Sequence, residues 1–277
     1  MIDGTKLVEQ DCHVSIRRHV RSELPFLRRF GRALTGNQQL ADLCVVQLLD
    51  DLVDSPTLMQ TAHNSKAALY KHLLAMLNSF ANAAAEGESP AFLSPLSRQA
   101  QLLTSVEGFT REEVGEILGL TEDRVALLLL ESAKQNSWAG SATVLVIEDE
   151  PLISMQLERL IDDLGHTLLG IATTHTQATR LGRNRVPDLI LSDVQLADGS
   201  SGIDAVRDIL SLRQVPVIYI TAYPERLLTG RRAEPNFLIS KPFDAEAVKA
   251  TIGQALFLEL QSREHGAPRA CCKGLVE

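Results

Sequence analysis

The sequence has little that would let the protein bind nucleic acid or span a membrane. Its 277 residues contain 27 Lys and Arg against 35 Asp and Glu, a formal charge of −8. Net acidity disfavours binding to nucleic-acid phosphates. No apolar run approaches the roughly 18 residues that a membrane-spanning helix needs, and the first residues lack the basic-then-apolar order of a signal peptide. We therefore expect a cytoplasmic protein without a membrane segment.

Cysteine and aromatic residues are also scarce. The four cysteines are at positions 12, 44, 271 and 272, with no C-x-x-C spacing. Two of them are adjacent near the C-terminus, where they cannot form the framework of a small disulfide-rich fold. The sequence therefore predicts free thiols, with neither a zinc site nor disulfide bonds.

The hydrophobic pattern changes near residue 140, and together with the length this change indicates two domains. Before that point apolar residues recur at helical spacing. The predicted helices are Val14–Arg32, Gln38–Asp54, Asn64–Ala85, Pro95–Val106, Arg111–Leu118 and Glu122–Ala133. We expect a helical domain over 1–134 that includes a loop at 83–90, then a linker over 135–142.

After residue 142, five short apolar runs alternate with amphipathic stretches, which predicts a parallel α/β sheet of the flavodoxin-like (βα)5 type over 143–260. The predicted strands are Val144–Ile147, Leu168–Ile171, Leu189–Leu191, Val217–Ile220 and Phe237–Ile239. Residues 261–277 are expected to form a flexible tail.

Carboxylates follow two of these strands. Glu148, Asp149 and Glu150 end the first strand and Asp193 ends the third, and in a parallel sheet such positions meet at one edge. Carboxylates brought together repel one another unless a cation lies between them, and hard oxygen ligands suit Mg²⁺. Thr221 and Lys241 end the fourth and fifth strands, where they could bind phosphoryl oxygens while one carboxylate serves as the nucleophile.

In these residues the second domain resembles the receiver domain of two-component response regulators. The resemblance implies that Asp193 accepts a phosphoryl group from a histidine kinase or phosphotransfer protein, assisted by Thr221 and Lys241. It also implies that Asp149, Asp193 and the backbone carbonyl of Gln195 ligate Mg²⁺, with Glu148 acting mainly through a bridging water. One departure is Leu238, where receivers often have Tyr or Phe as a switch residue.

Thr110 and Glu113 form a capping-box pattern before a short helix that ends at Gly119, and Thr121 is a second candidate cap. The resulting helix-turn-helix over 111–134 resembles region four of extracytoplasmic-function sigma factors, within a region-four-like segment over about 91–134. The segment from Leu24 to Gly36 resembles the start of sigma region two, within a region-two-like segment over about 10–55.

The helix-turn-helix lacks the side chains that read DNA. Residues 93–134 contain four basic and seven acidic side chains, whereas DNA-reading surfaces need Lys and Arg. Four consecutive leucines at 127–130 cannot all face one small core, so we expect at least one to contact a partner or the receiver. The one basic cluster comprises Arg17, Arg18, Arg21, Arg28, Arg29 and Arg32. Ion pairing with carboxylates of another domain or a partner is the favoured role of these arginines, and nucleic-acid binding the less favoured one.

The order of domains, sigma-like first and receiver last, resembles the PhyR family of alphaproteobacterial general stress response regulators. The resemblance implies a non-enzymatic anti-anti-sigma factor. Its sigma-like domain would sequester a NepR-like anti-sigma factor by mimicry once Asp193 is phosphorylated. Two alternatives remain: a DNA-binding transcriptional regulator that uses residues 111–134, and an enzyme with its chemistry in the α/β half.

Overall fold

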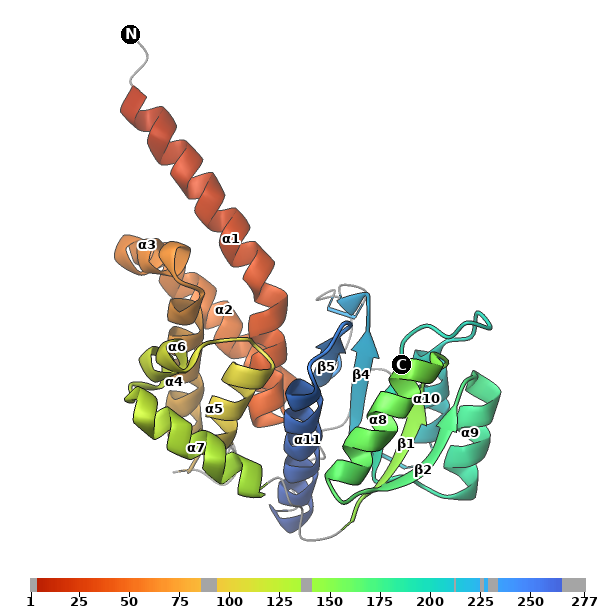
Figure 1. The fold of residues 1–277 in the computed structure, drawn as a ribbon. Coiled ribbons are helices and arrows are strands. Elements are labelled where there is room, and N and C mark those ends of the chain that lie inside the picture. Colours follow the sequence, from red (N-terminus) through yellow and green to blue (C-terminus); the bar gives the residue numbers. More distant parts are fainter. Residues whose placement is uncertain are drawn as a thin grey trace.

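The computed structural model describes residues 4–85, 94–135, 141–211, 213–224, 227–228 and 234–265, in which a helical half precedes an α/β half (Figure 1). The helical half consists of α1 (Gly4–Thr35), α2 (Gln38–Asp54), α3 (Pro56–Asn64), α4 (Lys66–Ala85), α5 (Leu96–Ser105), α6 (Arg111–Leu118) and α7 (Glu122–Gln135). The α/β half consists of β1 (Thr143–Ile147), α8 (Pro151–Asp163), β2 (Thr167–Ala172), α9 (His175–Asn184), β3 (Leu189–Ser192), α10 (Gly202–Leu210), β4 (Val217–Thr221), β5 (Phe237–Ser240) and α11 (Ala245–His265).

The predicted helix-turn-helix is formed by α6 and α7. The Thr110 hydroxyl accepts a hydrogen bond from the Glu113 backbone N–H at 3.2 Å, and Glu113 Oε2 accepts one from the Thr110 N–H at 2.8 Å. Gly119 ends α6 with a φ of 69°, in the left-handed region that glycine adopts without steric cost. Thr121 then caps α7 by accepting a hydrogen bond from the N–H of Arg124 at 3.4 Å. The expected caps are therefore confirmed.

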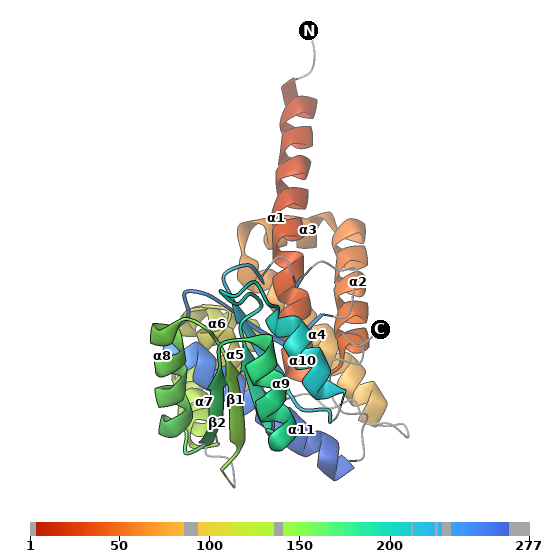
Figure 2. The same ribbon diagram turned by 90° about the vertical axis from the view of Figure 1, so that its right-hand side faces the viewer.

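The five strands form one parallel sheet in the order β2-β1-β3-β4-β5. Helices α8 and α11 cover one face of this sheet, and α9 and α10 cover the other (Figures 1 and 2). Because both faces are covered, four of the five strands are almost wholly buried, which explains their continuous apolar runs. The predicted α/β fold is confirmed.

Helix α11 is buried on two sides. One side packs on β4, β5 and α8, and the other packs on α1 and α5 of the helical half (Figure 1). Its apolar residues Val248, Ile252, Ala255, Leu256 and Leu258 are at most 4% exposed. They belong to one apolar cluster that runs from the helices of the first half into the sheet. The two halves therefore share a hydrophobic core.

Several helix boundaries differ from the prediction. Helix α1 runs from residue 4 to residue 35, beyond the predicted range at both ends. Helix α3 was not predicted as a separate helix. It begins after Ser55, whose hydroxyl accepts a hydrogen bond from the N–H of Leu58 at 3.3 Å, and Pro56 is its first residue. A serine N-cap followed by proline is a helix-start signal that the sequence already contained. Helix α4 then begins at Lys66.

The expected tail also begins later than predicted. Helix α11 continues to His265, and within its last turns Arg263 Nε pairs with Glu259 Oε1 at 2.9 Å. Helix α4 likewise extends to residue 85, into the predicted loop. The rest of that loop, linker residues 136–140 and tail residues 266–277 lie outside the described residues.

Cys44 is a buried free thiol, and burial raises its pKa to about 11. Its state agrees with the prediction, whereas the other three cysteine side chains lie outside the described residues. None of the helices in the described ranges combines the length and apolar content needed to cross a bilayer.

Gly202 is the residue at which α10 begins, directly against the end of β3. This close contact allows a prediction about the stability of the fold. A Cβ at this position would lie 1.8 Å from the backbone oxygen of Asp193 and 2.7 Å from Ser192 Oγ. Backbone cannot move aside as a flexible side chain can, so we expect Gly202→Ala to lower the free energy of unfolding by at least about 3 kcal/mol. Urea unfolding followed by circular dichroism measures this. Ser211→Ala, at the exposed other end of α10, should change it by less than about 0.5 kcal/mol. Equal stability of the two variants would contradict the prediction.

Candidate functional site

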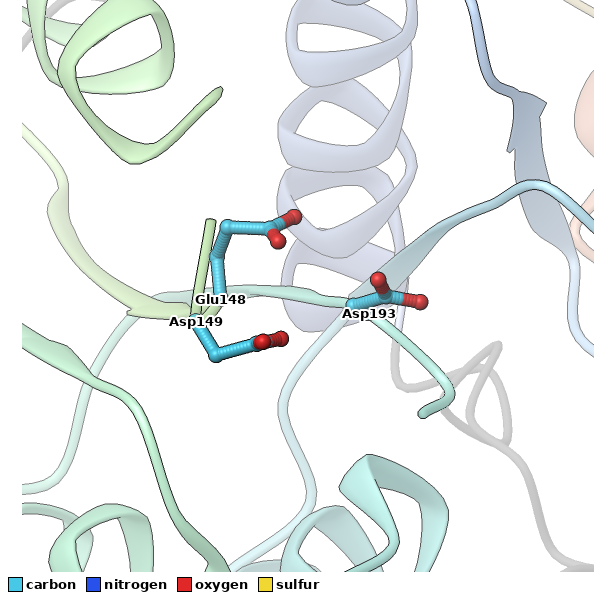
Figure 3. A group of neighbouring side chains, drawn as sticks. All are labelled: Glu148, Asp149 and Asp193. Atoms are coloured by element: carbon cyan, nitrogen blue, oxygen red, sulfur yellow. The ribbon is translucent and has the colours of Figure 1, made fainter. Parts of the chain in front are cut away.

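The register of the sheet brings the predicted acidic residues together. Ile147 at the end of β1 pairs with Ser192 at the end of β3. Glu148 and Asp149 follow the first of these strands and Asp193 follows the second, so the three side chains meet at the carboxyl edge (Figure 3). One carboxylate oxygen from each lies within 4.8 Å of the other two. The structure thus contains an acidic cluster where the sequence predicted one.

Lys241 joins this acidic cluster from the end of β5. Its Nζ lies 2.7 Å from Asp193 Oδ2, 2.9 Å from Glu148 Oε2 and 3.0 Å from Glu150 Oε1. These distances are typical of charge-assisted hydrogen bonds. One ammonium group is therefore shared by carboxylates from two strand ends.

Charge at this edge is not balanced. Burial raises the pKa of Glu148, and Lys241 offsets part of that rise. Burial by itself would lower the pKa of Lys241, but its hydrogen bonds with the three carboxylates raise it above its ordinary value. With Asp149 included, four carboxylates surround one ammonium group, and this surplus of negative charge favours a divalent cation with oxygen ligands.

Asp193 is held by its own backbone surroundings. It is 9% exposed, and its Oδ1 accepts hydrogen bonds from the N–H groups of Val194 at 2.5 Å and Gln195 at 3.3 Å. Thr221 is buried, and its hydroxyl accepts a hydrogen bond from the N–H of Tyr223 at 3.1 Å. Thr221 thus lies at the same edge of the sheet without bonding to the acidic cluster in this structure.

Two features of the site were only partly visible in the sequence. Glu150 was noted as part of the acidic run but not assigned to the site, although its side chain reaches Lys241. Its position directly after Asp149 is the signal that could have placed it there. Leu238 is 1% exposed and packs in the apolar cluster between the sheet and α10, so a buried aliphatic side chain takes the position where receivers often have an aromatic one.

Buried ion pairs connect the α/β half to the helical half. Glu234, which precedes β5, places its Oε2 2.7 Å from Arg32 Nη2 and its Oε1 3.3 Å from Arg28 Nη1, both on α1. The side chains of Arg32 and Glu234 are 0% and 1% exposed. Burial lowers the pKa of Arg32, and the adjacent Glu234 counteracts that effect. Loss of one member of this pair would leave the other buried charge with only a weaker partner, Asp42 for Arg32 at 3.7 Å or Arg28 for Glu234 at 3.3 Å.

The pairing predicted for the basic cluster, with carboxylates of another domain, is confirmed for Arg28 and Arg32, which contact Glu234, whereas Arg29 pairs within its own half. Besides the contacts with Glu234, Arg28 Nε pairs with Asp42 Oδ1 at 2.8 Å, and Arg29 Nη2 pairs with Glu107 Oε1 at 2.8 Å. The side chains at positions 17 and 18 lie outside the described residues. These three guanidinium groups are thus engaged within the protein.

Gln254 of α11 forms a second polar connection between the halves. Its Nε2 donates hydrogen bonds to the backbone oxygen of Ala33 at 2.7 Å and to Ser94 Oγ at 2.6 Å. The Gln254 side chain is buried. The contact between the halves therefore combines apolar packing with specific polar bonds.

Helix α7 divides its apolar residues between two environments. Val125 and Leu128 are buried, whereas Leu127 is 51% and Leu130 is 61% exposed. The expectation that the leucines do not all face one core is therefore confirmed. Arg124 lies 3.7 Å from Glu131 on the same helix. The exposed side chains of α7 thus combine leucines with more acidic than basic groups.

Comparison with known families identifies two sigma-like regions in the helical half and a receiver domain in the α/β half. The profile of the Sigma2 domain of PhyR matches residues 20–74, that of the PhyR sigma-like domain matches residues 91–136, and that of the response regulator receiver domain matches residues 144–253.

Similar proteins align over nearly the whole length. The phyllosphere-induced regulator PhyR of Methylorubrum extorquens is 44% identical over 91% of this chain and 98% of its own. The response regulator PhyR of Brucella abortus is 40% identical, with a TM-score of 0.78 over 91% of this chain and 98% of that one. The anti-anti-sigma factor PhyR of Bartonella quintana is 41% identical, with a TM-score of 0.80 over 91% and 99%. The chain therefore belongs to the PhyR family of response regulators, in which a sigma-like helical half precedes a receiver domain.

Proposed function

We propose that this protein is an anti-anti-sigma factor that phosphorylation of Asp193 activates. Its helical half sequesters an anti-sigma factor by resembling a sigma factor. The observation that carries the proposal is that the half with the acidic cluster covers the helical half through α11 and Glu234. The similar Bartonella quintana protein is described as an anti-anti-sigma factor. A NepR-like anti-sigma factor is the expected partner, in the cytoplasm where sigma factors act.

The acidic cluster suits Asp193 to accept a phosphoryl group. A carboxylate oxygen of Asp193 attacks the phosphorus of a phosphohistidine on a kinase or phosphotransfer protein. An O–P bond forms as the N–P bond breaks, and the released imidazole takes up a proton. Lys241 Nζ, 2.7 Å from Asp193 Oδ2, is positioned to bind the phosphoryl oxygens, and Thr221 contributes its hydroxyl from the end of β4. The protein is the acceptor in this transfer, and we expect no enzymatic activity of its own.

The residues present fit Mg²⁺. Asp149 and Asp193 offer carboxylate oxygens, Gln195 offers its backbone carbonyl, and Glu148 contributes through a bridging water. The surplus of carboxylates over the single ammonium group supports this assignment. Bound Mg²⁺ would neutralise part of the negative charge on the transferred phosphoryl group.

We infer that phosphorylation acts on the helical half through Thr221 at the end of β4 and Glu234 before β5, which belong to the connection between these strands. The new phosphoryl group adds about −1.5 to −2 charge at the edge of the sheet, beside Thr221 at the start of that segment. Glu234, near its end, forms the buried pair with Arg32. A shift of this segment that withdraws Glu234 uncovers α1 and α5, so the phosphorylated state favours separation of the halves.

The helical half presents surfaces suited to a protein partner. Leu43 and Val46 on α2 are 51% and 54% exposed, and Leu127 and Leu130 on α7 are also exposed. Exposed apolar side chains grouped on helices mark protein-binding faces more often than nucleic-acid interfaces. These faces favour the anti-sigma partner over the DNA-binding alternative.

The first prediction from this proposal concerns the phosphorylated residue. Incubation of the full chain with Mg²⁺ and a small acyl phosphate should add one phosphoryl group, detected by intact mass spectrometry, because Asp193 is the carboxylate that contacts Lys241 at the end of β3. Asp193→Asn should abolish labelling and chelation of Mg²⁺ should suppress it. Asp198→Asn, an exposed carboxylate in the same loop, should label like the wild type. Full labelling of Asp193→Asn would reject the assignment.

The second prediction is that the protein does not retain promoter DNA, even at low salt, where attraction to phosphates is strongest. The acidic and apolar face of α7 is the physical reason. A gel-shift assay with and without phosphorylation measures this. Sequence-specific retention that is lost in Arg124→Gln would instead support the DNA-binding alternative.

The third prediction concerns the pair between Glu234 and Arg32. Glu234→Gln leaves the buried Arg32 with only the more distant carboxylate of Asp42, at 3.7 Å, which destabilises the covered arrangement. We expect this variant to raise the affinity of the unphosphorylated full chain for its anti-sigma partner by at least about tenfold. Titration calorimetry measures this, with Glu246→Gln, an exposed carboxylate on α11, as the matched control. If phosphorylated and unphosphorylated wild-type protein bind equally well, the receiver does not control the helical half.

A further inference from the structure

Three arginines are buried near the contact between the halves, and one of them differs from the others. Arg29, Arg32 and Arg98 are at most 6% exposed. Arg29 has Glu107 at 2.8 Å and Arg32 has Glu234 at 2.7 Å. Among the described residues no carboxylate pairs with Arg98. A buried cation without an opposite charge is uncommon in proteins, because burial removes the hydration that stabilises it.

Arg98 lies on α5 against α11. Its guanidinium carbon is 4.3 Å from the centre of the Phe257 ring. Its Nε and Nη1 atoms are buried and have no hydrogen-bond partner in the part of the chain that the structure describes. Burial also lowers its pKa to about 10. The aromatic ring is thus the main compensation that the covered arrangement offers this charge.

That compensation is incomplete. A ring face attracts a cation through its quadrupole, but the attraction recovers only part of what an unpaired guanidinium loses when it leaves water. Separation of α11 from α5 would return Arg98 to solvent and restore its hydration. Arg98 therefore stabilises the separated state relative to the covered one, in the direction opposite to Glu234 and Gln254.

We propose that Arg98 destabilises the covered arrangement and thereby sets the fraction of unphosphorylated protein in which the halves are separated. The proposal rests on the function proposed above, in which the receiver half covers the partner-binding half. The shared apolar core and the buried pair of Glu234 with Arg32 hold the halves together. The partly compensated charge of Arg98 in the same contact weakens the association of the halves. One phosphoryl group can then shift the equilibrium between the covered and separated states.

Arg98→Met tests the proposal, because methionine keeps the length of the side chain and its apolar stem but removes the charge. We expect the unphosphorylated full chain to bind its anti-sigma partner at least about tenfold more weakly than the wild type, equivalent to about 1.4 kcal/mol. Affinity after phosphorylation should change much less. Arg111→Met, an exposed arginine at the start of α6, is the matched control and should leave both affinities unchanged.

Phe257→Leu supplies a test in the opposite direction. It removes the aromatic face from Arg98 while keeping an apolar side chain, so the guanidinium loses its main compensation. Unphosphorylated Phe257→Leu should therefore bind the partner more tightly than the wild type. A change of the same sign in Arg98→Met and Phe257→Leu would overturn the proposal.

Hydrogen exchange of the free protein separates this proposal from the proposed function, because it requires no partner. Backbone amides of α5 and α11 should exchange more slowly in Arg98→Met than in the wild type, and faster in Phe257→Leu. Unchanged or faster exchange in Arg98→Met would overturn the role of Arg98, even if the protein binds an anti-sigma factor. Equal loss of affinity before and after phosphorylation would also overturn it, since that result indicates direct contact between Arg98 and the partner.

Discussion

The burial of α11 on two sides is the constraint on which the rest of the structure depends. A receiver-like sheet needs this helix to cover one face, and the helical half needs the same helix to cover α1 and α5. This one helix thus completes the apolar core that the halves share, and neither half can separate from it without exposing apolar surface. The contact between the halves consists of α11, the packing of α1 on β5 and the flanking polar contacts. Such an arrangement can be switched by a change at either side of that helix.

Buried charge is used in two ways in this protein. At the edge of the sheet, several carboxylates are gathered around Lys241, which leaves a surplus of negative charge where a phosphoryl group and a divalent cation would bind. At the contact between the halves, arginines of the helical half are buried against Glu234 and Phe257 of the α/β half. The β4–β5 segment joins the two regions. In the mechanism proposed above, charge added at the first region alters the balance of buried charge at the second.

The helix-turn-helix illustrates how the backbone geometry of a motif can be retained while its surface differs from that of a DNA-reading motif. Its capping box and its left-handed glycine are intact, so the backbone geometry of the motif is fully specified. The exposed side chains of α7 include two leucines and three acids against two bases, Arg124 and Lys134. Backbone geometry and surface chemistry are set by different residues, and only the surface decides what the motif binds.

The sequence by itself determined the two halves, the strands and the residues of the acidic cluster. The spacing of apolar residues, the helix caps and the strand ends are local features of the sequence. A parallel sheet always brings the carboxyl ends of its strands to one edge. Only the tertiary structure decided that Glu234 pairs with Arg32, and that α11 packs against both halves. It also decided that Arg98 has an aromatic ring, and no carboxylate of the described ranges, as its partner. These contacts join residues far apart in the chain, and the apolar residues all round α11 do not reveal what covers each side. Which buried charges are paired follows from how the halves pack, and no local pattern encodes that packing.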